Sequence, residues 1–183
     1  MPEFIKSASR KNDFPLTERE VVFVGRSNVG KSSLLNAFYG QKIAYVGKTP
    51  GKTRLINFFD VDHRYTAVDV PGYGYARRSR QEAVEFARMM DDYFSRRDKI
   101  ALTVMIVDSR IGLTDDDIDM KDYLESSGID YVIVANKIDK LSNNQLNANK
   151  KKYFSDFDEV IYVSAEKRKN MDRLAEAIDR FIE

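Results

Sequence analysis

The chain has 183 residues, 43% of them hydrophobic and 32% charged, and a formal net charge of +1 at pH 7. This length and composition are typical of one soluble globular domain, and the absence of cysteine excludes a disulfide framework and thiolate metal sites. No apolar run approaches the roughly 18 residues of a membrane span, and the N-terminus lacks the apolar core of a signal peptide. We therefore expect a cytoplasmic monomer, although other compartments also tolerate a chain without cysteine.

The first nineteen residues carry little pattern, and we treat 1–19 as an N-terminal extension of a domain that spans 20–183. Phe4 and Ile5 favour either an edge strand or a cover for an apolar patch, and the following Asp-Phe-Pro favours a turn.

Short apolar runs rich in β-branched residues predict a mostly parallel sheet of six strands, because runs without polar alternation are typical of strands covered on both faces. The predicted strands occupy residues 20–24, 54–61, 65–69, 101–107, 131–135 and 160–163. Only residues 62–64 join the second run to the third, and so short a link allows a hairpin but not a parallel crossover. One strand is therefore expected to be antiparallel.

Amphipathic helices are expected between the strands. Two apolar stripes repeat at helical spacing, namely Phe86, Met90, Tyr93 and Phe94, and Leu174, Ala177, Ile178, Phe181 and Ile182. Capping boxes at 114–117 and 142–145 mark two further helix starts. The expected fold class is α/β, with three layers and helices on both faces of the sheet.

Residues 25–32 fit the phosphate-loop pattern G-x-x-x-x-G-K-[ST] at every fixed position. A predicted strand before the loop and a predicted helix over 33–39 would aim backbone N–H groups and the positive helix end at one anion. Lys31 would reach the β- and γ-phosphates, and the Ser32 hydroxyl would ligate Mg²⁺. The predicted phosphate-binding residues here are Gly25, Arg26, Ser27, Asn28, Val29, Gly30, Lys31, Ser32 and Ser33. The alternative is a glycine-rich turn that matches by chance, which the flanking strand and helix disfavour.

A D-x-x-G motif, from Asp69 to Gly72, follows the third predicted strand. Open α/β sheets bind ligands at the C-terminal ends of their strands. The Asp69 carboxylate would hold Mg²⁺ through water, and the Gly72 N–H would approach a γ-phosphate. The motif alone is common, but its place after a phosphate loop favours a nucleotide switch.

An N-K-x-D motif, formed by Asn136, Lys137 and Asp139, predicts a guanine site. A carboxylate at Asp139 can accept both N1–H and N2–H of guanine, whereas adenine would leave it unpaired. Asn136 would brace the loop, and the Lys137 stem would cover the base. Ser164 and Ala165, after the last strand, would supply a backbone N–H to the guanine carbonyl. An ordinary charged turn is the alternative, which the two preceding phosphate motifs disfavour.

Five phrases of this chain resemble the EngB (YihA/YsxC) family of ribosome-biogenesis GTP-binding proteins, in the TrmE–Era–EngA–YihA group of P-loop GTPases. They are G-R-S-N-V-G-K-S at 25–32, T-P-G-K-T-R-L-I-N-F-F at 49–59, D-V-P-G-Y-G-Y at 69–75, V-D-S-R at 107–110 and N-K-I-D at 136–139. The resemblance runs from about residue 20 to the C-terminus and implies a Mg²⁺-dependent GTPase in large-subunit assembly. The family commonly has threonine where this chain has Asn136, but asparagine is the general GTPase choice.

The resemblance also implies where a nucleotide-sensing loop lies. Thr53 matches the family's switch threonine, which contacts Mg²⁺ and the γ-phosphate, and Gly51 and Lys52 would lie beside the phosphates. Thr49, in a similar setting, is the competing assignment.

Hydrolysis by the chain alone is expected to be slow. Many small GTPases place a water-orienting glutamine after the D-x-x-G glycine, where this chain has Tyr73. The groups expected to act in catalysis are Lys31, Thr53, Gly72 and Asn28. In some relatives an asparagine that matches Asn28 ligates K⁺, and the alternative is that Asn28 only caps the loop.

The two expected switch stretches, residues 40–59 and 70–81, are basic and contain no acidic residue. This pattern indicates either solvated surface charge or a face that meets RNA, and the family resemblance favours rRNA. The expected RNA contacts are Lys42, Lys48, Arg77, Arg78 and Arg80. Two other functions remain as alternatives. One is a nucleotide-gated rRNA-binding scaffold in which hydrolysis is incidental, and the other is a GTPase domain for RNA modification or metal transport, which normally needs further domains or membrane spans.

Overall fold

A computed structural model describes residues 1–44, 55–75, 78–96 and 98–183. The strands are β1 Pro2–Ala8, β2 Glu20–Gly25, β3 Ile56–Val61, β4 Tyr65–Asp69, β5 Ile100–Asp108, β6 Tyr131–Asn136 and β7 Val160–Tyr162. The α-helices are α1 Lys31–Tyr39, α2 Arg80–Phe94, α3 Asp115–Ser126, α4 Asn143–Tyr153 and α5 Met171–Ile182, with short 3₁₀ turns at Lys11–Asp13 and Ile138–Lys140.

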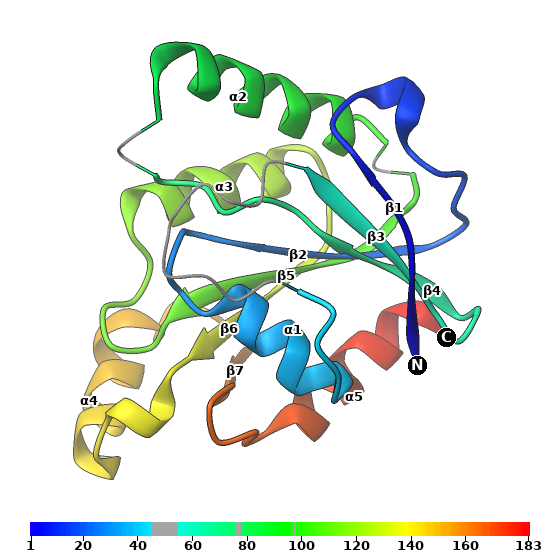
Figure 1. The fold of residues 1–183 in the computed structure, drawn as a ribbon. Coiled ribbons are helices and arrows are strands. Elements are labelled where there is room, and N and C mark those ends of the chain that lie inside the picture. The colour runs from blue at the N-terminus through cyan, green and yellow to red at the C-terminus, as the bar shows by residue number, and fades with distance from the viewer. Residues whose placement is uncertain (45–54, 76–77, 97) are drawn as a thin grey trace.

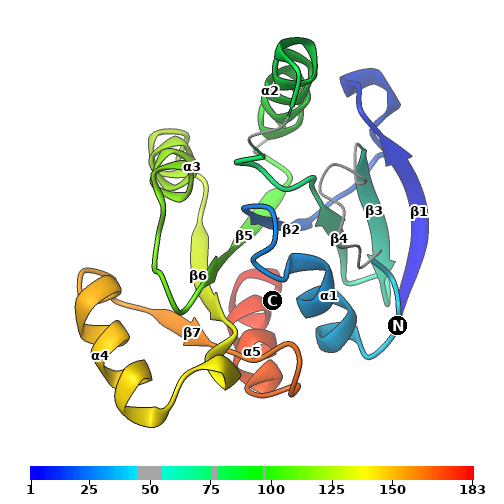
Figure 2. The same cartoon turned by 60° about the vertical axis from the view of Figure 1, so that its left-hand side comes forward.

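The strands form one seven-stranded sheet in the order β1-β3-β4-β2-β5-β6-β7. The β2–β4, β2–β5, β5–β6 and β6–β7 pairs are parallel, whereas β3 runs antiparallel to both of its neighbours. Helices α2 and α3 cover one face of the sheet, and α1 and α5 cover the other (Figures 1 and 2). The predicted α/β class, with one antiparallel strand joined through a hairpin, is confirmed.

Strand β1 adds a seventh strand to the six that the pattern predicts. It pairs antiparallel with β3, with a register irregularity between Phe4 and Lys6. Phe4 meets the Phe59 ring edge-on, with the two centroids 5.7 Å apart. The edge strand is therefore present, while the division of the chain at residue 20 stays a prediction.

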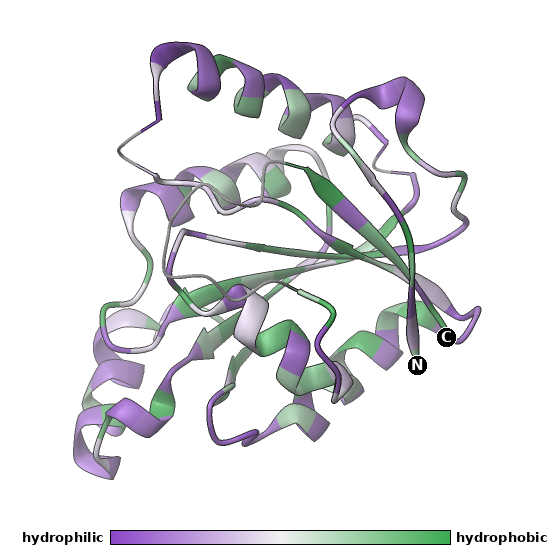
Figure 3. Cartoon of the chain, in the orientation of Figure 1, coloured by the Kyte–Doolittle hydropathy of each residue, from purple (hydrophilic) through white to green (hydrophobic). Residues whose placement is uncertain are grey.

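The core consists of two apolar clusters, one on each face of the sheet. Tyr93 and Phe94 of α2 are buried in one, and Leu174 and Ile178 of α5 in the other. Phe181, which the stripe on α5 placed in the core, is 38% exposed. The prediction that Phe181 belongs to the buried stripe is therefore wrong. Figure 3 shows the amphipathic character of α2, which has hydrophilic residues on its outer side.

Local signals set the helix starts. The capping boxes at Thr114 and Ser142 are confirmed, and α2 begins with a third, formed by Ser79 and Glu82. Helix α1 starts at Lys31, two residues before the predicted start, because Gly30 takes the N-cap position.

A buried carboxylate anchors the N-terminal end of β2. Glu20 is fully buried, accepts hydrogen bonds from the Tyr93 hydroxyl at 2.7 Å and from Thr17, and lies 3.4 Å from Arg96. These contacts tie the extension and α2 to the strand that leads into the phosphate loop. In the described part of the chain, no helix is long and apolar enough to cross a membrane.

Candidate nucleotide-binding site

The three predicted motif segments lie at the C-terminal ends of the parallel strands β4, β2 and β6, with β5 between the last two. The phosphate loop follows β2, the D-x-x-G segment follows β4, and the N-K-x-D segment follows β6. Parallel strands bring these ends to one edge of the sheet, where open α/β proteins bind ligands. The fold therefore brings together segments that lie up to about a hundred residues apart in the sequence.

The phosphate loop has a left-handed backbone at two positions, Asn28 with a φ of 71° and Gly30 with a φ of 93°. Gly30 is the N-cap of α1, so Ser32 and Ser33 lie in the first turn of that helix. The first N–H groups of a helix have no intrahelical acceptor, and they carry the positive end of its dipole. The loop therefore has the geometry of an anion site. The left-handed backbone at Asn28 is compatible with both roles predicted for it, the K⁺ ligand and the loop cap.

Lys31 and Asp69 form a buried ion pair. The Lys31 ammonium donates a hydrogen bond to the Asp69 carboxylate, and the two side chains are 8% and 3% exposed. The sequence assigns them to different partners, the phosphates and Mg²⁺. In this structure the two side chains neutralise each other: Asp69 supplies the negative charge expected from the phosphates, and Lys31 supplies the positive charge expected from Mg²⁺. Such pairing is needed because a buried charge without a partner is costly.

The D-x-x-G segment packs against the phosphate loop through its backbone. The Ser27 N–H donates to the Tyr73 carbonyl at 2.9 Å, and the Tyr73 N–H donates to the Gly25 carbonyl at 3.3 Å. A Cβ placed on Gly72 would lie 3.2 Å from both the Ser27 nitrogen and its Oγ. Glycine at position 72 therefore permits this close approach.

The Tyr73 side chain, at the position where many small GTPases have glutamine, is buried and points toward α3. It is 7% exposed, and its hydroxyl donates to the Asp117 carboxylate at the start of α3 at 2.6 Å. Burial, reinforced by the Asp117 charge, holds the pKa of Tyr73 far above its usual range. The Tyr73 hydroxyl is therefore a neutral donor that is engaged by α3.

Arg78, predicted as an RNA contact, is held by the D-x-x-G segment. Its Nη2 donates to the Gly72 carbonyl at 2.6 Å, and its guanidinium carbon lies 3.9 Å from the centroid of the Phe86 ring. Burial lowers the pKa of Arg78. Lys42 and Arg80, by contrast, are exposed.

The predicted guanine loop is braced by Asn136, which is 2% exposed. Its Nδ2 donates to the Val29 carbonyl at 3.0 Å, and its Oδ1 accepts from the Ala165 N–H at 3.0 Å. In this arrangement, the Ala165 N–H that we expected to meet guanine is engaged by Asn136.

Asp139 lies beside this brace with an ionised carboxylate. It accepts a hydrogen bond from the Ser164 hydroxyl at 2.6 Å, and Lys140 lies 3.3 Å away. Burial alone would raise the pKa of Asp139, but these hydrogen bonds outweigh it and lower the pKa below its usual value. An ionised acceptor is what the two N–H groups of guanine would require.

Several predicted residues lie outside the described ranges: Lys48, Thr49, Gly51, Lys52, Thr53, Arg54 and Arg77. Three residues close to the site carry contacts that the motifs did not assign, namely Asp108, Arg110 and Asp117. The only sequence signals for them were the V-D-S-R phrase, quoted for the family resemblance, and the capping box at 114–117.

The fold and the three motif segments define a P-loop GTPase. The sequence family described as "50S ribosome-binding GTPase" matches residues 20–137. The probable GTP-binding protein EngB of Clostridium beijerinckii is 46% identical over 151 residues, which cover 81% of this chain and 76% of that protein. The chain belongs to the EngB family of GTP-binding proteins.

Solved structures share the fold. The crystal structure of a probable GTP-binding protein engB superposes with a TM-score of 0.70 and 24% identity, covering 89% of this chain and 98% of that one. Era, in complex with MgGDPNP and nucleotides 1506–1542 of 16S ribosomal RNA, superposes with a TM-score of 0.68 and 22% identity, covering 92% of this chain and 58% of that one.

Gly30 offers a test of how closely the two loops must pack. A Cβ at Gly30 would lie 2.5 Å from Asn136 Nδ2, whereas one at Gly128, also at positive φ, meets nothing within 4 Å. Both Gly→Ala changes strain the backbone by about 1 kcal/mol. Only Gly30→Ala should also displace Asn136, and it should weaken GDP binding by about tenfold or more. Titration with a fluorescent GDP, beside thermal melts of both variants, measures this, and equal GDP affinity in the two would contradict the close-packing account.

Proposed function

We propose that this chain is a Mg²⁺·GTP-dependent switch that acts in the cytoplasm on the assembling large ribosomal subunit. The observation that supports the nucleotide part is the meeting, at one sheet edge, of the phosphate loop, the Lys31–Asp69 pair and the ionised Asp139. The ribosomal part is supported by the description of the matching family as a 50S ribosome-binding GTPase.

Mg²⁺ fits the residues at the phosphate end. Asp69 is a buried carboxylate that already pairs with a cation, and Ser32 lies in the first turn of α1. Once phosphate engages Lys31, Asp69 needs another cation, and oxygen donors of this kind suit Mg²⁺. Among the described residues, no group of three or more His, Cys, Asp or Glu is placed to hold a metal. The remaining ligands would come from phosphate, water and Thr53, and the ion would neutralise charge on the phosphates.

Slow hydrolysis follows from what surrounds Gly72. Its N–H is proposed to contact the γ-phosphate, while Arg78 holds its carbonyl and Tyr73 is bonded to Asp117. Both neighbouring side chains are therefore held by contacts within the protein. Faster turnover therefore calls for a partner or for K⁺ at Asn28, because a missing charge-stabilising group can cost roughly 10³–10⁵ in rate.

Asp139→Asn tests the guanine site. Asparagine keeps the shape and the Ser164 neighbour, but its amide N–H opposes guanine N2–H and suits the C2 carbonyl of xanthine. GTP affinity should fall by at least about tenfold while XTP affinity rises. Competition titrations of both nucleotides measure the ratio, and an unchanged GTP-to-XTP preference would remove Asp139 from base recognition.

The salt dependence of subunit binding tests the RNA-facing surface. Lys42 and Arg80 are exposed. The double variant Lys42→Ala with Arg80→Ala should therefore flatten the plot of log affinity for the subunit against log salt concentration, by roughly 0.7–0.9 in slope for each lost phosphate contact. GTP affinity should stay unchanged. Co-sedimentation with 50S subunits under GDP, GTP and a non-hydrolysable analogue supplies the measurement.

The matched control removes two exposed basic residues elsewhere, Lys6 of β1 and Arg173 of α5. A wild-type slope in the Lys42/Arg80 variant, or an equal change in the control, would contradict the proposed surface. If binding is nucleotide-dependent but indifferent to blocked hydrolysis, the scaffold alternative is favoured.

A further inference from the structure

A buried carboxylate lies between the phosphate loop and the guanine loop. Asp108 is the last residue of β5, stands opposite Asn136 in the strand register and is 5% exposed. Arg110 donates three hydrogen bonds to this carboxylate. Its backbone N–H and Nε donate to Oδ1 at 3.0 Å and 2.9 Å, and its Nη2 donates to Oδ2 at 2.8 Å. Both carboxylate oxygens are thereby fixed in orientation.

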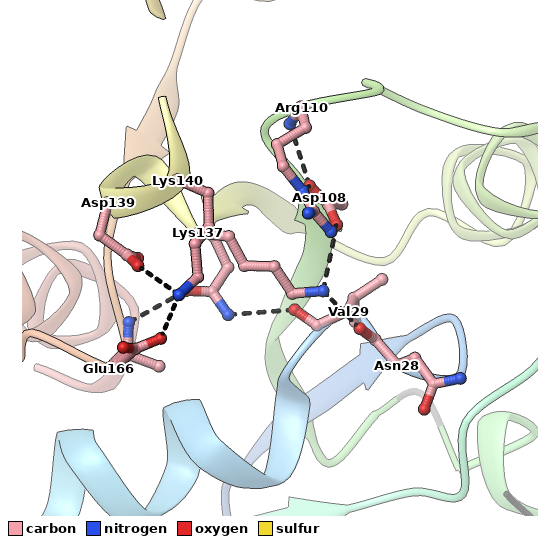
Figure 4. Close-up of polar contacts among 10 residues, drawn as sticks. Asn28, Val29, Asp108, Arg110, Lys137, Asp139, Lys140 and Glu166 are labelled. Atoms are coloured by element: carbon pink, nitrogen blue, oxygen red, sulfur yellow. Dashed lines mark hydrogen bonds and ion pairs between the residues drawn. The ribbon is translucent and has the colours of Figure 1, made fainter. Parts of the chain in front are cut away.

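The same carboxylate contacts the lysine of the N-K-x-D motif. Asp108 Oδ2 lies 3.1 Å from Lys137 Nζ, which also donates to the Asn28 carbonyl of the phosphate loop at 2.7 Å. Figure 4 shows Lys137 extended between the two loops, with its ammonium between Asp108 and Asn28. The Lys137 ammonium therefore links the end of β5 to the phosphate loop.

The charge on Asp108 is permanent at physiological pH. Burial alone would raise its pKa, but the hydrogen bonds from Arg110 and Lys137 outweigh this and lower the pKa to about 2. Lys137 thus always faces an anion. The lysine also holds a φ of 70°, a left-handed backbone that a non-glycine residue adopts only when its surroundings impose it.

We propose that Asp108 is a positioning residue for nucleotide binding, which acts by fixing the Lys137 ammonium and, through it, both the stem that covers the base and the Asn28 carbonyl. This inference rests on the proposed guanine role of the N-K-x-D loop. A lysine side chain is flexible and strongly hydrated, so without an anion its ammonium would turn to solvent. Asp108 removes that freedom before the nucleotide arrives, and preorganisation of this kind raises affinity.

The position of the Asp108–Lys137 contact predicts how the affinities for GDP and GTP respond to loss of the Asp108 charge. Lys137 lies at the base end, which GDP and GTP share. Asp108→Asn keeps the side-chain shape and an oxygen for Arg110 but removes the charge. It should weaken GDP and GTP binding by the same factor, about tenfold, and leave their ratio unchanged. The matched control is Asp179→Asn, whose carboxylate pairs with Arg64 on the exposed side of α5 at 3.0 Å and which should bind both nucleotides normally.

A double-mutant cycle separates positioning from a general structural effect. Lys137→Met keeps the stem but removes the ammonium, so Asp108→Asn should cost no further affinity in that background. An equal loss in both backgrounds would mean that Asp108 only supports β5, and it would overturn the proposal. Should Asp108→Asn fail to fold in thermal melts, Arg110→Gln replaces a side chain that is 46% exposed. This change should weaken the binding of both GDP and GTP about threefold, again only when Lys137 is present.

Two outcomes distinguish this inference from the proposed function. If Asp108→Asn and Arg110→Gln bind GDP like the wild type while Asp139→Asn loses GTP, the positioning role is wrong and the guanine site stands. If Asp139→Asn also binds like the wild type, the base site itself is misplaced, and the positioning role falls with it.

Discussion

The buried ion pair between Lys31 and Asp69 is the interaction on which the rest of the site depends. One partner begins α1 and the other ends β4, so the pair joins the phosphate loop to the D-x-x-G segment across the sheet edge. Neither charge can remain buried without a partner at reasonable cost. On the proposed function, nucleotide binding would be an exchange, in which phosphate would pair with Lys31 and a cation with Asp69. Such an exchange would make the binding of phosphate and of metal mutually dependent.

The phosphate loop also receives contacts from the D-x-x-G and N-K-x-D segments. Tyr73 pairs with its first residues, Asn136 bonds to the Val29 carbonyl, and Lys137 bonds to the Asn28 carbonyl. The phosphate loop is therefore in direct contact with both the segment that would sense GTP and the loop that would hold the base. The same geometry leaves little room for side chains, which is why Gly30 and Gly72 carry none.

Much of this arrangement could be predicted from sequence because it is local. A strand, a glycine-bounded turn and a helix start at 25–32 follow from neighbouring residues, as do the capping boxes of α3 and α4. The order of the motifs then places them at one sheet edge, since parallel strands share their C-terminal ends. The hairpin between β3 and β4 followed from the short link alone.

The side-chain partners could not be predicted, because they depend on tertiary register. Tyr73 meets Asp117 from 44 positions away, and Arg78 turns inward to a carbonyl that no charge pattern reveals. The basic stretch predicts solvent or RNA for Arg78 and gives no sign of the Gly72 carbonyl and the Phe86 ring that its side chain contacts, so the RNA contact stays a prediction. Glu20 is similar, since nothing in an apolar run marks a glutamate for full burial.

The exchange of partners at the ion pair is tested most directly by Asp69→Asn. We expect this variant to bind GDP in EDTA more tightly than the wild type does, because Lys31 no longer has a competing internal anion. We also expect Mg²⁺ to add little to its affinity for GTP, whereas it should strengthen GTP binding by the wild type. Isothermal titrations of both proteins, with GDP in EDTA and with GTP in the presence and absence of Mg²⁺, give these affinities. A variant that binds Mg²⁺-free GDP no better than the wild type and keeps the full Mg²⁺ enhancement would contradict the exchange.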